Sequence, residues 1–256
     1  MATETRTGMA RTTAKRATAP EILARLEKLG KPGTRAIYER HAGRKDVDAF
    51  GVSFADIEKI RKEIKRDHEL ALALWKSGRF EARVIATMVA DPAQVTAALA
   101  DRLIGDVRHA QAGYFVAELV AASPVADAVM RKWTRARSEI VQTAGYAVLG
   151  SLFRLKAPPP DDFCASVLET IEREIHDTPN RARYAMNGAL IAIGGGSPAL
   201  RERALAAAKR IGKVEVDHGD TDCKTPDATT YILKMAAREA AKKTPAKKPP
   251  RGKKKA

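Results

Sequence analysis

Apolar residues recur with helical spacing through the whole middle of the chain, and this periodicity restricts the fold more than any other feature of the sequence. In the segment FEARVIATMV, the apolar positions on one helical face are Phe80, Val84, Ile85, Met88 and Val89. The segments DIEKIRKEI and FCASVLETIEREI repeat this spacing. Apolar and polar residues nowhere alternate for long enough to indicate a half-buried strand. The pattern therefore predicts an all-α protein.

Short polar residues placed directly before prolines divide this pattern into separate helices. These pairs are Asp91-Pro92, Ser123-Pro124, Thr178-Pro179, Ser197-Pro198 and Thr225-Pro226. The polar side chain can accept an unsatisfied helix N–H, and proline at the first helical position needs no partner for its own nitrogen. Glycines, among them the run at 194–196, are expected to stop helices. About a dozen short helices, paired about every forty residues, predict a right-handed α-solenoid of HEAT-like repeats.

The net charge of +15 is concentrated at the two ends of the chain. Residues 1–19 lack apolar periodicity, and residues 241–256 are a mixture of Lys, Pro and Ala that cannot bury enough surface to fold. Both ends are therefore predicted to be disordered, which leaves residues 20–240 as one helical-repeat domain. The basic residues of the C-terminal tail are Lys242, Lys243, Lys247, Lys248, Arg251, Lys253, Lys254 and Lys255.

The C-terminal tail favours a nucleic acid as partner, because lysines spaced by prolines and alanines stay extended and neutralise phosphates with release of counterions. A solubility tail or attraction to an anionic membrane surface is the alternative. The sequence has no apolar run long enough to span a bilayer and no apolar signal segment at its N-terminus. We therefore expect a cytoplasmic, nucleoid-associated protein with no membrane partner.

Two further basic clusters lie inside the predicted domain. In MRKWTRAR, the cluster around Trp133 consists of Arg131, Lys132, Arg135 and Arg137. On a concave surface these cations would contact a phosphate backbone, and the indole would be available for stacking. Burial of Trp133 in the core beneath solvated charges is the alternative. A second, smaller cluster is formed by Arg181 and Arg183 at the start of a predicted helix.

Residues 214–232, VEVDHGDTDCKTPDATTYI, combine aspartates, a histidine and a cysteine within a few positions. The aspartates lack the spacing of a calcium loop, and no second His/Cys pair is present, so we predict no metal site. The segment instead resembles a turn followed by a helix start. Its predicted structural and capping residues are Asp217, His218, Asp220, Thr225 and Asp227. Phosphate-loop and dinucleotide motifs are also missing, so we predict no cofactor.

Four segments together resemble a known family. They are LALALWKSGRFEARVIATMVADP (70–92), KWTRARSEIVQTAGYAVLGSLFR (132–154), HDTPNRARYAMNGALIAIG (176–194) and the closing VDHGDTDCKTPDATTYI. These are similar to the DNA alkylation repair proteins, the HEAT-like-repeat family of bacterial alkylpurine DNA glycosylases. The resemblance covers roughly residues 20–240, and its most specific parts are LW-x-SG-x-x-E-x-R and the aspartate-rich closing segment.

The resemblance implies an all-helical fold that holds duplex DNA in a basic concave groove and excises cationic alkylated bases. That excision depends on an aspartate preceded by a tryptophan, on a later arginine and on a second tryptophan. The corresponding positions here are His109 and Gly113, then Thr143, then a position near Gly188. A carboxylate stabilises the positive charge that builds up on the sugar. The weak candidates for that carboxylate are Asp106 and Glu118.

We therefore expect a monomeric DNA-binding member of this family that contacts duplex DNA through phosphates. Weak or absent base excision is favoured over full glycosylase activity. A non-enzymatic scaffold that binds a protein partner on its concave surface is the alternative, since helical solenoids commonly serve this role.

Overall fold

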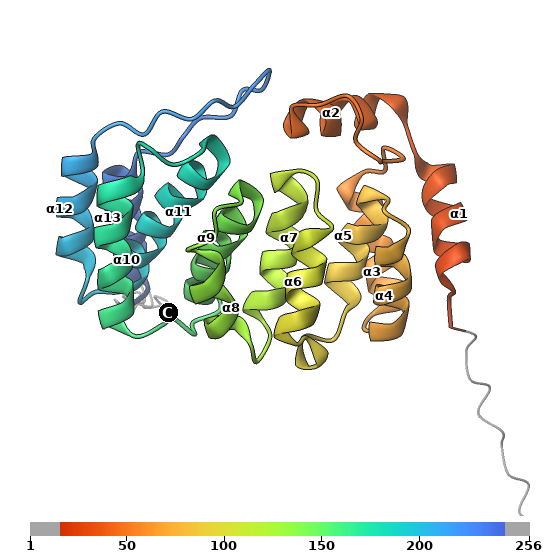
Figure 1. The fold of residues 1–256 in the computed structure, drawn as a ribbon, viewed down its shortest axis with the longest axis horizontal. Coiled ribbons are helices and arrows are strands. Elements are labelled where there is room, and N and C mark those ends of the chain that lie inside the picture. Colours follow the sequence, from red (N-terminus) through yellow and green to blue (C-terminus); the bar gives the residue numbers. More distant parts are fainter. Residues whose placement is uncertain (1–15, 244–256) are drawn as a thin grey trace, which may run out of the picture.

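The structure is a computed structural model that describes residues 16–243, and within this range all regular secondary structure is helical (Figure 1). The first layer consists of α3 (Phe54–Ile64), α5 (Phe80–Val89), α7 (Ala110–Ala121), α9 (Glu139–Arg154), α11 (Asn180–Gly196) and α13 (Ala228–Lys243). The second layer consists of α4 (His68–Lys76), α6 (Ala97–Gly105), α8 (Ala126–Trp133), α10 (Asp161–Glu174) and α12 (Arg201–Ile211). The predicted all-α solenoid is confirmed.

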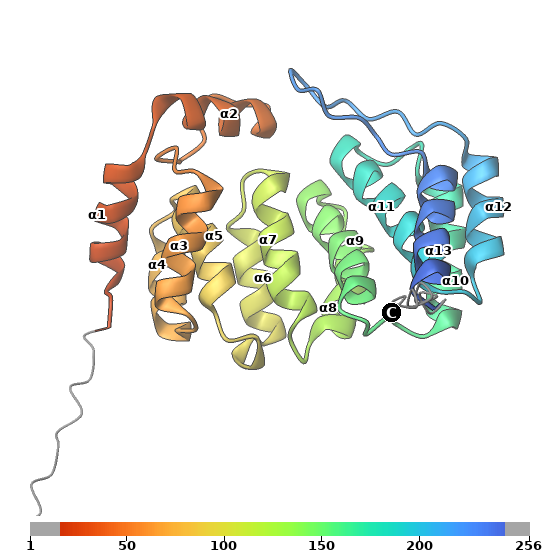
Figure 2. The same cartoon turned by 180° about the vertical axis from the view of Figure 1, so that it is seen from behind.

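The odd-numbered helices from α3 to α13 pack against one another in series, and each even-numbered helix covers its neighbours from the other side. One continuous core fills the space between the two layers. Its largest side chains are fully buried, among them Trp133, Leu149, Ile171 and Met186. Alternate helices run in opposite directions, so every helix of the first layer begins at the same edge of the molecule (Figures 1 and 2). We call this the upper edge, as it lies at the top of both views.

Two irregular segments also lie at the upper edge. At one end of the array, α1 (Ala19–Leu29) leads into α2 (Pro32–Ala42), and residues 43–53 then descend to α3. We call residues 43–53 the strap. At the other end, residues 212–227 form two limbs that project beyond the helices before α13 begins (Figure 2). We call residues 212–227 the arm.

The helical region is slightly longer than the predicted domain at both ends. Thr18 caps α1 through a reciprocal pair of contacts with Glu21, so the ordered chain starts before residue 20. At the other end, α13 runs to Lys243, three residues beyond the predicted boundary. The predicted disorder of residues 1–15 and 244–256, and the basic side chains from Lys242 onward, lie outside what the structure describes. Over its described length, the chain has no helix that combines the length and apolarity of a membrane span.

Candidate nucleic-acid interface

The upper edge gathers the N-terminal ends of the first-layer helices. Neighbouring starts are tied together, since the Glu139 carboxylate at the beginning of α9 accepts the backbone N–H of Arg181 in α11 at 2.6 Å. The starts of α7, α9 and α11 have no side-chain cap of their own. Free N–H groups and the helix dipole give such ends a partial positive charge, which favours anions. The backbone at the starts of α7 and α9 therefore favours anions.

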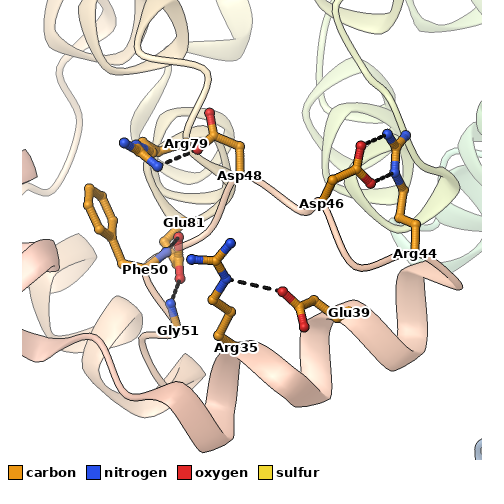
Figure 3. Close-up of polar contacts among 9 residues, drawn as sticks. All are labelled: Arg35, Glu39, Arg44, Asp46, Asp48, Phe50, Gly51, Arg79 and Glu81. Carbon is orange, nitrogen blue, oxygen red and sulfur yellow. Dashed lines mark hydrogen bonds and ion pairs between the residues drawn. The ribbon is translucent and has the colours of Figure 1, made fainter.

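Glu81 fixes the strap beneath α2. Its carboxylate is completely buried in α5 and accepts backbone N–H groups from Phe50 at 3.1 Å and Gly51 at 2.6 Å (Figure 3). It also accepts the N–H of Val52 at 3.0 Å. Gly51 is required here because its φ is +88° and a Cβ would lie 2.3 Å from the carbonyl oxygen of Lys31. Hydrogen bonds to a charged acceptor are the stronger kind. Glu81 therefore determines where α2 sits.

Arg83, two residues later, holds the end of α6, where the chain turns toward α7. Its guanidinium lies 4.9 Å from the centre of the Trp75 ring and donates to the backbone carbonyl of Asp106 at 2.9 Å. The Trp75 indole N–H donates to the Asp106 carboxylate at 2.9 Å. Trp75, Glu81 and Arg83 are the defining residues of LW-x-SG-x-x-E-x-R. In this structure, the motif positions the segments around the upper edge.

A cavity of about 320 Å³ opens between the end of α2 and the starts of α7, α9 and α11. Its lining includes His41, Arg44, Arg108, His109, Gln111, Tyr114, Glu139, Arg181 and Tyr184. We call this the cationic cavity, because three arginines line it against one carboxylate, Glu139. Arg44 pairs with Asp46, so Arg108 and Arg181 are the cations of the lining that have no ion pair among the described residues. Within the described residues, the Arg181 guanidinium has no hydrogen-bond or ion-pair partner. Its charge is available to an anion.

His109 lies at the base of the cationic cavity. Burial, together with the charges of Arg44 and Arg83, lowers the pKa of its imidazole, so the ring is neutral at physiological pH. Its Nδ1 atom and the Oε1 atom of Gln111 are buried without a hydrogen-bond partner in the part of the chain described here. Buried polar groups normally have partners. Both residues line the cationic cavity, while these two atoms themselves are shielded from solvent.

The predicted cluster at 131–137 is only partly available for binding. Trp133 is 1% exposed and donates its indole N–H to Asp101 at 2.9 Å, so the core alternative is the right one and the expected stacking role is wrong. Lys132 pairs with the same carboxylate at 2.7 Å. Arg131 pairs with Asp127 at 2.8 Å and lies over Phe163. Lys132 is exposed but paired. The exposed members of the cluster without an ion pair among the described residues are Arg135 and Arg137, in the segment that leads to α9.

Arg181 and Arg183 have different environments, although the sequence groups them together. Arg181 lines the cationic cavity. Arg183 instead donates to the backbone carbonyl groups of His176 and Thr178 in the α10–α11 turn and to the backbone carbonyl of Glu215 in the arm, the last at 2.9 Å. Its guanidinium thus holds the base of the arm against α11.

Neither carboxylate candidate faces the cationic cavity. Asp106 accepts the Trp75 indole N–H, as described above. Glu118 lies further along α7, where it pairs with Arg154 and accepts a hydrogen bond from the Ser151 hydroxyl at 3.2 Å. Both groups have structural partners.

The arm is ordered by its own polar groups. The Asn180 side chain pairs with the Asp217 backbone in both directions, at 2.7 and 2.8 Å, and His218 lies edge-on to Tyr184 with ring centroids 5.5 Å apart. The His218 Nε2 atom hydrogen-bonds with the Thr225 hydroxyl at 3.0 Å. The arm therefore contacts Tyr184, a residue of α11 that lines the cationic cavity.

The predicted cap of the last helix is shifted by two residues. The α13 helix begins at Ala228, and Asp227, not Thr225, accepts the N–H of Thr230 at 2.8 Å. Thr225 is used inside the arm instead. Asp220 lies exposed near the arm tip. Across residues 16–243, no group of three or more His, Cys, Asp or Glu side chains is arranged to hold a metal ion.

The sequence interpretation missed the basic residues at the end of α2 and before α7. These are Arg40, His41, Arg44, Lys45 and Arg108. The segment RHAGRK is clearly basic in the sequence, but the sequence does not show which other segment lies next to it. In the structure it lies beside the segment before α7, because the Arg44 guanidinium donates to the Arg108 backbone carbonyl at 3.3 Å.

Comparison with known proteins places the chain in a family. The family model described as DNA alkylation repair enzyme matches residues 22–243. The chain belongs to the DNA alkylation repair family. Two bacterial proteins are similar in sequence to this chain. They are the uncharacterized protein Lin0241 of Listeria innocua, which is 29% identical, and the uncharacterized protein Lmo0209 of Listeria monocytogenes, which is 28% identical. Each alignment covers 83% of this chain and 95% of the relative.

A solved structure is also similar to this member of the DNA alkylation repair family. It superposes with a TM-score of 0.76 at 28% sequence identity, and the match covers 87% of this chain and 95% of the other. That protein is described as a member of "a new family of proteins related to the HEAT-like repeat DNA glycosylases with affinity for branched DNA structures". The predicted HEAT-like fold and family are therefore confirmed.

Proposed function

We propose that this protein binds branched DNA at its upper edge and does not release bases from it. The observation that carries the proposal is the cationic cavity, where the unpaired guanidinium of Arg181 lies beside the starts of α7 and α9, which have no side-chain cap. Such an arrangement suits a phosphate group better than any other common ligand. The affinity of the structurally similar relative for branched DNA supports the choice of DNA form.

The carboxylates near the cationic cavity are engaged in other contacts, and this favours a protein that does not release bases. Stabilising positive charge on a deoxyribose requires a negative group that is free to approach it. Around the cationic cavity, Glu139 accepts the Arg181 N–H, while Asp106 and Glu118 are engaged elsewhere. The neutral imidazole of His109 supplies no negative charge. These contacts favour DNA binding over excision.

We also propose that the basic C-terminal tail adds phosphate contacts of its own and that the protein acts as a monomer in the cytoplasm, next to the nucleoid. The tail carries lysines without a nearby acid, which suits contacts that do not depend on DNA sequence.

The proposal is tested with an Arg181→Ala variant and the matched control Arg102→Ala, an exposed arginine on the second-layer helix α6. Fluorescence anisotropy with a four-way junction should show about tenfold weaker binding for Arg181→Ala, because a charge-assisted hydrogen bond is lost. The slope of log K against log salt should become shallower by about one, the contribution of a single phosphate contact. The control should bind like the unmodified protein.

Single-turnover release of bases from methylated duplex DNA is measured on the same preparations. We expect release at the spontaneous rate. Faster release would contradict the non-catalytic part of the proposal. Failure of the unmodified protein to bind either DNA would overturn the whole proposal and favour a scaffold that binds a protein partner.

A further inference from the structure

We propose that the face of α5 and α7 next to the cationic cavity binds unpaired bases at the branch point of the DNA. This inference rests on the proposed function, and it specifies which part of a branched DNA is recognised. The observation behind it is a groove of about 440 Å³ between these two helices. Its apolar and small side chains are Thr87, Met88, Pro92, Phe115, Leu119 and Ala122. We call it the apolar groove.

In and beside the apolar groove, large apolar side chains are exposed. Met88, which lines the groove, is 39% exposed, and Phe54, which lies outside the groove at the start of α3 and packs on Phe115, is 44% exposed. The rings of Phe54 and Phe115 stack with centroids 5.8 Å apart and an interplanar angle of 26°. An aromatic pair with one open face can accept a further flat ring by stacking.

The groove is continuous with the proposed phosphate site. Tyr114 lines both the cationic cavity and the apolar groove, so the two sites share a wall on α7. Burial raises the pKa of the Tyr114 phenol, which keeps this shared wall uncharged. A nucleotide whose phosphate contacts Arg181 would therefore have apolar surface on one side of it.

Unpaired bases fit this groove better than continuous duplex does. A duplex keeps its bases stacked inside and presents phosphates and sugars, which gain little from contact with Met88 and Phe115. A branch point offers bases with exposed faces, and every base stacks on an aromatic ring. The charged side chains at the rim are already paired, Arg66 with Asp91 at 3.6 Å and Glu118 with Arg154. The groove thus offers contact without a specific base preference.

The test uses three DNAs of equal length: a continuous duplex, a fully paired three-way junction, and the same junction with two unpaired thymines at the branch. The variants are Phe115→Leu and Met88→Gln, and the control is Leu155→Ala, an exposed apolar residue at the far end of α9. Met88 is exposed enough for a polar replacement to leave the fold intact, which circular dichroism and thermal unfolding verify.

We expect both variants to lose about tenfold in affinity for the junction with unpaired thymines, the size of a lost base–aromatic contact. Binding to the continuous duplex should change less than twofold, and Leu155→Ala should change neither. Equal losses on all three DNAs, or none on any, would overturn the assignment of the groove while leaving the proposed DNA binding in place. Lack of binding to all three DNAs by the unmodified protein would instead refute the proposed function itself.

Discussion

At the scale of single residues, the family motif acts through buried hydrogen bonds far from its own segment. Glu81 is an isolated carboxylate in a core helix, which would be unstable without partners. Three consecutive backbone N–H groups of the strap supply them. The sequence displays Glu81 as part of a recognisable pattern, and it gives no sign that the partners lie thirty residues earlier. A role that depends on such a contact can be read only from the folded chain.

Two replacements of Glu81 should weaken the attachment of the strap to α5 by different amounts. Glu81→Gln should lower the free energy of unfolding by about 2 kcal/mol, because the amide keeps one acceptor oxygen and loses the one that holds Phe50. Glu81→Ala should cost about 4 kcal/mol, as all three N–H groups lose their acceptor. Chemical denaturation measures both, with the exposed Glu69→Gln as control. Equal losses of stability in the Gln and Ala variants would contradict a role in which both carboxylate oxygens accept hydrogen bonds from the strap.

At the scale of helices, periodicity predicted the elements well and their ends less well. The spacing of apolar residues depends on burial alone, which a sequence records directly. Caps depend on local turn geometry. Thr178, expected to cap α11, donates its hydroxyl to the Glu174 carbonyl at 2.8 Å instead. The glycines of 194–196 do end α11, and they also admit close packing, since a Cβ on Gly194 would lie 2.7 Å from Ala204.

Substitutions of two glycines in α9 distinguish the effect of close packing from the effect of helix propensity. A Cβ on Gly145 would lie 2.5 Å from the Thr134 nitrogen and 2.6 Å from the Trp133 carbonyl carbon, and backbone atoms there cannot yield. Gly145→Ala should therefore destabilise the protein by about 3 kcal/mol. Gly150 has open space around it, so Gly150→Ala should stabilise the helix by about 0.5 to 1 kcal/mol. Thermal unfolding of the pair checks this, and the same sign for both would refute close packing of α8 on α9.

At the scale of the whole molecule, the candidate site could be predicted only in part. Arg181 was found because basic residues near a helix start are visible in sequence. The cationic cavity was not, since it forms where α2, α7, α9 and α11 meet and no local pattern records that meeting. The sequence left two alternatives for Trp133, stacking on DNA or burial in the core, for a related reason: its partner Asp101 lies on a different helix.

The basic tail should contribute to DNA binding in a way that differs from the cavity. Deleting residues 244–256 removes six basic residues. Affinity should fall alike for every DNA sequence, and the dependence of log K on log salt should become shallower, because each lost phosphate contact contributes about 0.9 to the slope. Titrations of unmodified and truncated protein at several salt concentrations measure this. An unchanged slope would exclude the tail from the complex.

The shared direction of the first-layer helices has a consequence for how this protein can evolve. Because each of these helices starts at the upper edge, the attraction for anions there comes partly from the direction of the helices and not from side chains alone. Individual arginines on that edge can then be lost by mutation, and others gained at different positions, while the helix starts still favour anions. Descendants would be free to exchange one nucleic-acid ligand for another without first losing the ability to hold any.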